Sequence, residues 1–254
     1  MTSDLLNYGF AEQRITQFQS ALRESGQLSA DAFLELRPEF SSIGKLAIAR
    51  ALIPYEHSAH LFERDAPHLY DLIWKALKAP VKQFGENRLT IVTFNYDRSF
   101  EHYLCQVAHH SFNARGSELQ ELVSCVPVHH VYGSLGSLTQ RAYDARVDAV
   151  LVNVAAESLR VMNERIETDP ELTEAQAALE DAQRVLFLGF GYDELNLQRL
   201  QCGKWASTTE TLGSAFGLLD RERQRVLDTL RGARLASAGD DCVVTLRRLA
   251  HLED

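Results

Sequence analysis

The sequence has few cysteines, and none of them are closely paired. The four are Cys105, Cys125, Cys202 and Cys242, well separated and without a C-x-x-C motif. This spacing excludes a zinc ribbon built from paired thiolates and gives no sign of a disulfide framework. We therefore expect the four side chains to be buried as small apolar groups, and we expect no bound metal.

Long apolar runs and blocks of basic residues are also missing. No apolar run approaches the roughly 18 residues of a membrane-spanning helix, and the start, "MTSDLLNYGFAEQRITQ", lacks the features of a signal peptide. Lys and Arg number 26 against 35 Asp and Glu, which gives a net charge of −9. Nucleic acid and membrane are therefore disfavoured as partners. The 45% of apolar residues can supply a sizeable core, so we expect a soluble, cytoplasmic protein.

Residues 1–87 read as a helical N-terminal segment without strands. Ser29 is placed to cap a helix, Pro38 stands near the start of another, and residues 68–84 form a further helix candidate that Gly85 ends. The buried face expected after Pro38 consists of Ile43, Leu46, Ala47, Ala49 and Ile53.

From Arg88 onward, strand patterns alternate with helix patterns. The strand candidates are 89–94, 126–132 and 184–190, with weaker ones at 210–217 and 241–249. Helices are expected at 97–109, 154–165, 173–181, 193–200 and 220–230. This alternation predicts an α/β fold, a Rossmann-like and mostly parallel sheet with helices on both faces. We place it at residues 88–254, preceded by the helical segment 1–87.

Polar or glycine-rich residues follow three of the predicted strands. Asn95 and Asp97 follow the first strand, "YGSLG" the second and "GFGYDE" the third. Ligands of parallel sheets bind beyond the carboxyl ends of the strands, so these turns are candidate site residues. The plainer alternatives are a turn residue for Asn95 and a helix cap for Asp97.

The succession "TFNYDRSFEHYL", "VHHVYGSLG" and "VLFLGFGYDELNLQRL" resembles the sirtuin-like domain of bacterial NAD-degrading defence proteins. The resemblance runs from about residue 89 to residue 200. It implies a Rossmann-like domain that hydrolyses NAD to nicotinamide and ADP-ribose. The alternatives are a non-catalytic sensor or interaction module that binds NAD or ADP-ribose, and a truncated, inactive fragment. Deacylases of the sirtuin family carry two C-x-x-C pairs, which this chain lacks.

The resemblance assigns roles to the first motif, which begins at Thr93. It implies that Asn95 faces the nicotinamide ribose or the attacking water, and that Asp97 holds the loop or the nicotinamide end. A neutral amide suits this task, because it can orient water beside an oxocarbenium-like centre without forming a covalent adduct.

The second motif departs from the family, which places a histidine base before the glycine. Tyr132 stands there, followed by Gly133 and Ser134 as expected cofactor-binding residues. Tyrosine is a poor base at neutral pH, whereas His130 lies two residues earlier, on the same face if the strand continues. His130 is therefore the candidate base, Tyr132 is a candidate ribose contact, and His129 is expected to be packed in the core.

The third motif offers Gly189 and Gly191, whose backbone N–H groups can approach a nucleotide closely. It is not the G-x-G-x-x-G fingerprint, because Glu194 occupies the third glycine position. The resemblance implies contact with the adenosine side of NAD.

The family's first strand carries a Gly-Ala-Gly loop for the pyrophosphate, and nothing of that kind is found in residues 1–87. We therefore expect a sheet that lacks one central strand, in a truncated product or in a genuine variant. Another copy of the chain, an effector partner or a weakly predicted strand could fill the gap.

Overall fold

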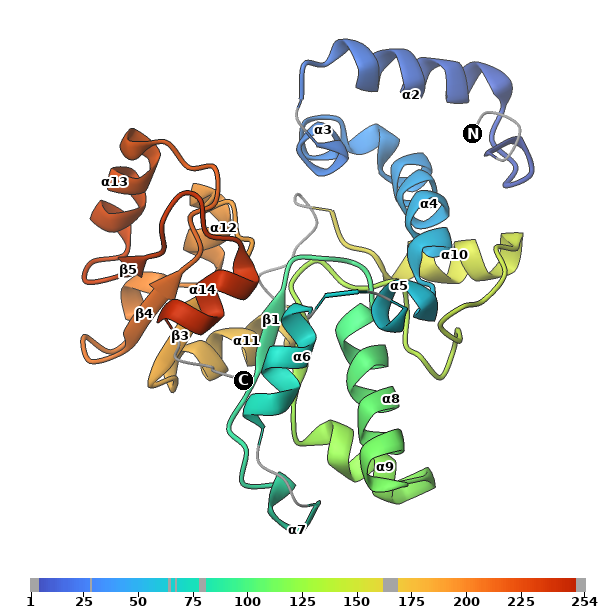
Figure 1. Ribbon diagram of the computed structural model, residues 1–254. Coiled ribbons are helices and arrows are strands. Elements are labelled where there is room, and N and C mark those ends of the chain that lie inside the picture. Colours follow the sequence, from blue (N-terminus) through green and yellow to red (C-terminus); the bar gives the residue numbers. More distant parts are fainter. Residues whose placement is uncertain are drawn as a thin grey trace. The chain divides into compact units, whose positions relative to one another are not determined.

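The computed structural model describes residues 5–27, 29–63, 65–66, 68–77, 81–161 and 169–249 (Figure 1). The chain forms two compact units, each assembled from separate segments. The first unit consists of residues 1–64, 92–107 and 128–171, and the second of residues 65–91, 108–127 and 172–254. This division differs from the expected boundary at residue 87: residues 1–64 share a unit with residues 92–107 and 128–171, whereas residues 65–87 belong to the second unit.

Helices dominate the first unit. Its elements are α2 (Glu12–Glu24), α3 (Ala30–Leu36), η1 (Pro38–Phe40), α4 (Ser41–Leu52), η2 (Ile53–Tyr55), α5 (Ser58–Phe62), β1 (Ile91–Thr93), the start of α8 (Ser99–Phe112), β2 (Val128–His130) and α10 (Ala149–Ser158). Strand β1 begins one residue before the second segment of this unit.

Helix α3 begins where the sequence predicts. Ser29 Oγ accepts a hydrogen bond from Ala32 N at 3.1 Å, which satisfies one of the free N–H groups of α3. The expected face of α4 is largely correct: Ile43, Leu46, Ala49 and Ile53 are buried, and Ala47 is half-buried. A second core lies between α2, α3 and η1, where the rings of Phe18, Phe33 and Phe40 have centroids 5.7–6.0 Å apart.

The second unit alternates strands with helices. It contains α6 (Leu69–Ala76), α7 (Val81–Phe84), α9 (Gly116–Ser124), α11 (Pro170–Glu180), β3 (Arg184–Phe187), α12 (Glu194–Arg199), η4 (Cys202–Lys204), β4 (Glu210–Gly213), α13 (Asp220–Thr229), β5 (Arg234–Leu235) and α14 (Cys242–Leu249). Helix α11 starts just before the unit's third segment, and the last turn of α8 also belongs here.

The sheets are parallel but small. Strands β3, β4 and β5 pair in sequence order, with Leu186 opposite Leu212 and Leu212 opposite Arg234 (Figure 1). Strands β1 and β2 form a separate two-stranded sheet. The described part of the chain is therefore α/β, but its strands form two small sheets and not the expected single sheet. Every residue of β1 is half-buried, so this strand is not fully covered.

The expected C-terminal strand at 241–249 is wrong, because this segment forms helix α14. Asp241 Oδ1 accepts a hydrogen bond from Val244 N at 2.8 Å, which caps the helix, and Leu246 is buried against Leu72 and Leu212. The two β-branched valines favour a strand, but apolar residues recur at every third or fourth position, and this helical spacing predicts the observed structure better. The last described strand is β5, which is shorter than the expected strand and precedes it in the sequence.

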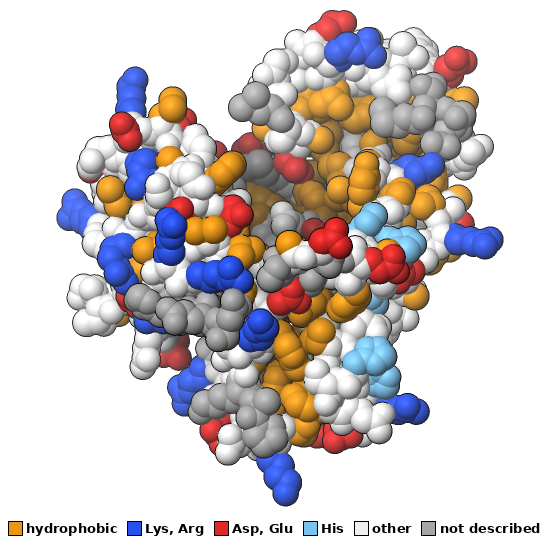
Figure 2. Space-filling view, in the orientation of Figure 1, with side chains coloured by type: hydrophobic (Ala, Val, Ile, Leu, Met, Phe, Trp, Pro, Cys, Tyr) orange, Lys and Arg blue, Asp and Glu red, His pale blue; other side chains and the backbone are white. Residues whose placement is uncertain are grey.

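The boundaries of several other elements differ from those expected from the sequence. The helix expected at 68–84 is two helices, α6 and α7, with residues 78–80 outside the described part. The helix expected at 154–165 is α10, which starts earlier; the last four residues of the expected helix lie outside the described residues. All four cysteines are free and half-buried, so the expectation of full burial is wrong. Among the described helices, none is both long and apolar enough to cross a membrane. Acidic and basic side chains are interspersed on the face shown in Figure 2.

Candidate functional site

The predicted site residues belong to both units. Thr93, Asn95, Asp97, His130, Tyr132, Gly133 and Ser134 lie in the first unit, and Gly189 and Gly191 lie in the second.

The loop after β1 carries an exposed asparagine on an anchored backbone. Thr93 Oγ1 accepts a hydrogen bond from Asn95 N at 3.1 Å, while the side chain of Asn95 is exposed. The hydroxyl of the next residue, Tyr96, lies 2.5 Å from Asp31 Oδ1. Asp97 Oδ1 accepts from Ser99 N at 3.1 Å at the start of α8. Asp97 therefore acts as a helix cap, the plainer of its two expected roles, and Asn95 projects outward from a fixed turn.

His130, the candidate base, is buried at the end of β2 and has partners at both ring nitrogens. Its Nδ1 lies 2.8 Å from the carbonyl oxygen of Asn95, and its Nε2 lies 2.9 Å from Glu101 Oε1. Burial alone would lower the pKa of His130. The hydrogen bond to Glu101, the charge of that carboxylate, the Asn95 carbonyl and the charge of Asp97 outweigh burial and raise this pKa above its ordinary value.

The neighbouring His129 is buried, as expected for a core histidine. Its Nδ1 lies 3.2 Å from an oxygen of Glu171, whose side chain is 54% exposed. The contact is a partly exposed pair, and such pairs contribute little to stability.

The turn after β2 is shaped by backbone packing. Tyr132 is buried, with its ring edge-on to Phe94 at a centroid distance of 5.6 Å. Gly133 has φ +72° and forms an isolated antiparallel bridge with Leu159. A Cβ at Gly133 would collide with the backbone oxygen of Ser158. The strand ends at His130, so side-chain alternation does not extend to Tyr132 as expected, and Ser134 lies half-buried in the same turn.

A buried charge network, which the sequence did not indicate, supports the loop that carries Asn95. The carboxylate of Glu56 accepts hydrogen bonds from Arg98 N at 2.8 Å, from Arg98 Nη2 at 2.6 Å and from Arg141 Nη2. All three residues are at most 3% exposed. Arg98 Nη1 also donates to the carbonyl oxygen of Ser137 at 3.0 Å. The network therefore ties the start of α8, and with it the loop of Asn95, to the segment around residues 137–141.

A serine, a histidine and an aspartate also meet in the first unit. Ser58 Oγ lies 2.7 Å from His102 Nε2, and Ser58 N donates to Asp144 Oδ1 at 2.7 Å. The His102 ring stacks on Tyr143 at a centroid distance of 4.0 Å, and burial lowers the pKa of His102. In a hydrolytic triad the carboxylate orients the histidine, whereas here it binds the serine. We therefore regard the cluster as a structural cap of α5.

The second unit has a cavity beyond the carboxyl ends of β3 and β4. It encloses about 360 Å³. Its lining residues are Gly189, Phe190, Gly191, Ser214, Ala215, Phe216, Leu218, Asp241 and Cys242. Gly189 has φ +63° and donates its N–H to Ser214 Oγ at 2.9 Å, so this glycine permits the turn that opens the cavity. The structure thus brings both predicted glycines together with Ser214 and Asp241, which the sequence did not indicate.

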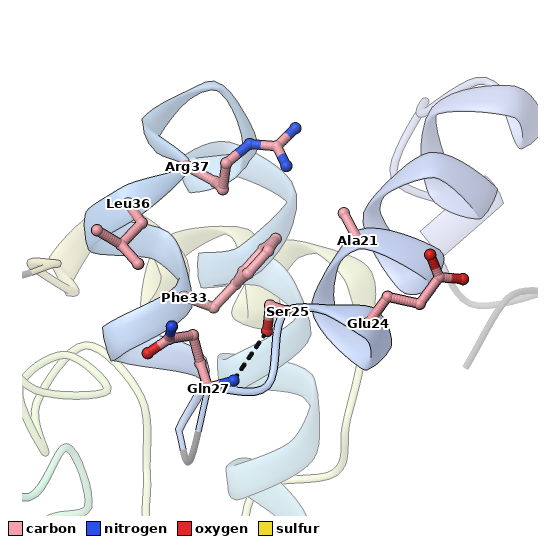
Figure 3. A pocket seen from close by; sticks show the side chains of 7 residues that line it. All are labelled: Ala21, Glu24, Ser25, Gln27, Phe33, Leu36 and Arg37. Carbon is pink, nitrogen blue, oxygen red and sulfur yellow. Dashed lines mark hydrogen bonds between the residues drawn. The ribbon is translucent and has the colours of Figure 1, made fainter.

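The first unit has a second cavity, of about 310 Å³, between α2 and α3 (Figure 3). It is lined by Ala21, Glu24, Ser25, Gln27, Phe33, Leu36 and Arg37. Figure 3 shows the ring of Phe33 among side chains of mixed polarity. None of the predicted site residues lines it.

Comparisons with protein-family models, with curated proteins and with solved structures give no match. Two features of the chain can serve a function: the cavity beyond β3 and β4 can accept a small ligand, and the exposed amide of Asn95 on its fixed turn can orient water or a hydroxyl.

Proposed function

We propose that the chain binds NAD and hydrolyses it to nicotinamide and ADP-ribose, as part of a bacterial defence response. The observation that carries the proposal is the cavity of the second unit, at the edge of a parallel sheet where nucleotides bind. The order β3, α12, β4, α13, β5, α14 is that of half a Rossmann-like domain. Gly189 and Gly191, predicted from sequence to contact a nucleotide, both line this cavity.

The lining suggests which part of NAD it accepts. None of the lining residues is Lys or Arg, and the carboxylate of Asp241 would repel a phosphate. A carboxylate suits ribose hydroxyls, and the exposed ring of Phe216 offers a surface on which a base can stack. We therefore assign the cavity to the adenosine end of NAD.

Asn95 is the candidate residue for the chemistry. In the reaction the bond between C1′ of the ribose and the nicotinamide nitrogen breaks, and its electron pair leaves with nicotinamide. A water oxygen then bonds to C1′ and releases a proton to solvent. Because the transition state is oxocarbenium-like, orientation of this water matters more than removal of its proton. Asn95 would orient the water or the ribose, while Asp97 holds the loop through its contact with Ser99.

Substitution of Asn95 by alanine tests the chemistry. We expect nicotinamide release by the purified full chain to fall at least about 100-fold, as for loss of one positioned polar group. Asn153→Ala, at an exposed site on α10, is the matched control and should leave the rate unchanged. Equal rates in the Asn95 variant and the unmodified protein would exclude this role.

Filling the cavity tests binding separately. A Cβ at Gly191 meets nothing within 4 Å and its φ is not positive, so Gly191→Leu should fold normally and occupy the cavity. We expect calorimetry to show at least about 10-fold weaker binding of ADP-ribose, equivalent to about 1.4 kcal/mol. Gly203→Leu, at an equally open glycine outside the cavity, should bind normally. Unchanged affinity in both variants would place the ligand elsewhere.

A second candidate function is binding of NAD or ADP-ribose without cleavage. It is favoured by the contacts of His130: both ring nitrogens face acceptor oxygens, and a ring protonated at both nitrogens cannot accept a proton from the attacking water. In that case calorimetry would show binding, and NAD would be recovered intact.

A further inference from the structure

The imidazole of His130 has a hydrogen-bond partner at each of its two ring nitrogens. The Asn95 carbonyl oxygen lies 2.8 Å from Nδ1, and Glu101 Oε1 lies 2.9 Å from Nε2. The imidazole is 9% exposed, and the side chain of Glu101 is 22% exposed. Glu101 comes from α8, so His130 joins β2, the loop after β1 and this helix.

Both partners of the ring can only accept hydrogen bonds. A carbonyl oxygen and an ionised carboxylate have lone pairs and no proton to give, so each nitrogen needs its own N–H. A neutral imidazole has a single N–H and would turn a lone pair toward one of the two oxygens. The contacts therefore select the imidazolium form, and Asp97 adds a second negative charge nearby.

We infer that His130 and Glu101 are positioning residues that hold the main chain of Asn95, and that His130 does not act as a general base. The inference rests on the proposed hydrolysis. Asn95 has its N–H bound to Thr93 Oγ1 and its carbonyl oxygen bound to His130. In the following residue, the carbonyl oxygen of Tyr96 accepts from Leu135 N at 2.8 Å. The exposed amide of Asn95 thus projects from a backbone fixed on both sides, as orientation of a water requires.

The two roles of His130 predict opposite pH dependences. A general base must be neutral, so its activity falls as the pH drops below its pKa. A positioning imidazolium must be charged, so activity falls as the pH rises through a pKa that lies above the ordinary value. Glu101, Asp97 and the Asn95 carbonyl are the groups that raise this pKa, and burial opposes them.

The first test needs no NAD. In the full chain, proton–nitrogen NMR should show both ring nitrogens of His130 protonated at pH 6, with a titration midpoint above about 6.5. The His130→Gln variant identifies the signals. Glu101→Gln should lower the midpoint and shift the backbone amide signals of Asn95 and Tyr96. A neutral ring at pH 6, or unmoved amide signals in Glu101→Gln, would overturn the inference even if the chain proves inactive.

The second test measures nicotinamide release. We expect Glu101→Gln to lower kcat about 10-fold with little change in KM, and to move the alkaline fall in activity to lower pH. Glu157→Gln, on the exposed side of α10, is the control. An activity that falls on the acidic side with the His130 midpoint would restore the base role. If the unmodified protein releases no nicotinamide but NMR shows an imidazolium at His130, the proposed hydrolysis is wrong and the positioning contact still holds.

Discussion

Glu56→Gln is expected to lower the free energy of unfolding by about 3–5 kcal/mol, the cost of removing one partner from a buried ion pair. Glutamine keeps the shape of the side chain but removes the charge that compensates Arg98 and Arg141, both 1% exposed. Each guanidinium would then remain buried without a counter-charge. For a chain of this size, the loss corresponds to a fall in Tm of about 10 °C, measured by thermal unfolding.

The control is Glu39→Gln in the same unit. Glu39 also pairs with an arginine, Arg37, at 2.6 Å, but both side chains are close to half exposed. Water screens this pair, so no measurable change in Tm is expected. Equal falls in Tm in the Glu56 and Glu39 variants would contradict the claim that burial makes the Glu56 ion pair strong.

The Glu56 network also sets a pH dependence. Burial alone would raise the pKa of Glu56, but hydrogen bonds and charge from Arg98, joined by Arg141, lower it below its ordinary value. A lowered pKa means that the folded state holds the proton less tightly than the unfolded state. The stabilisation is therefore complete above the unfolded-state pKa and is lost as the pH falls through the folded-state value.

Gly133→Ala is expected to cost about 2–4 kcal/mol, more than the roughly 1–3 kcal/mol of backbone strain alone. The residue has φ +72°, and the added methyl group would meet the backbone oxygen of Ser158, which cannot move aside like a flexible side chain. Denaturant unfolding monitored by circular dichroism would measure the loss.

Gly26→Ala separates the two costs. Gly26 belongs to the same unit and has φ +67°, but a Cβ there meets nothing within 4 Å, so only backbone strain is expected. The excess loss at Gly133 measures the collision with Ser158. A Gly133→Ala protein that is as stable as Gly26→Ala but fails to bind NAD would assign this glycine to the ligand, as the sequence resemblance implied.

Local features of the sequence predicted local structure well. The cap at Ser29, the strands β1 and β3 and the turn at Gly189 each depend on residues close together in the chain, so propensity and periodicity were sufficient. The segment of α14 was ambiguous because its short apolar pattern suits either a strand or a helix. Its packing against Leu72 and Leu212, far away in sequence, favoured the helix.

The sequence by itself determined the α/β character of the chain, most helix positions and which turns carry polar residues. Only the tertiary structure decided that the strands form two small sheets, that Glu56 neutralises arginines 42 and 85 positions away, and that Glu101 faces His130. The physical reason is that periodicity reports which face of an element is buried and not what covers it. A buried charge or a shared proton depends on partners that only folding brings within hydrogen-bond distance.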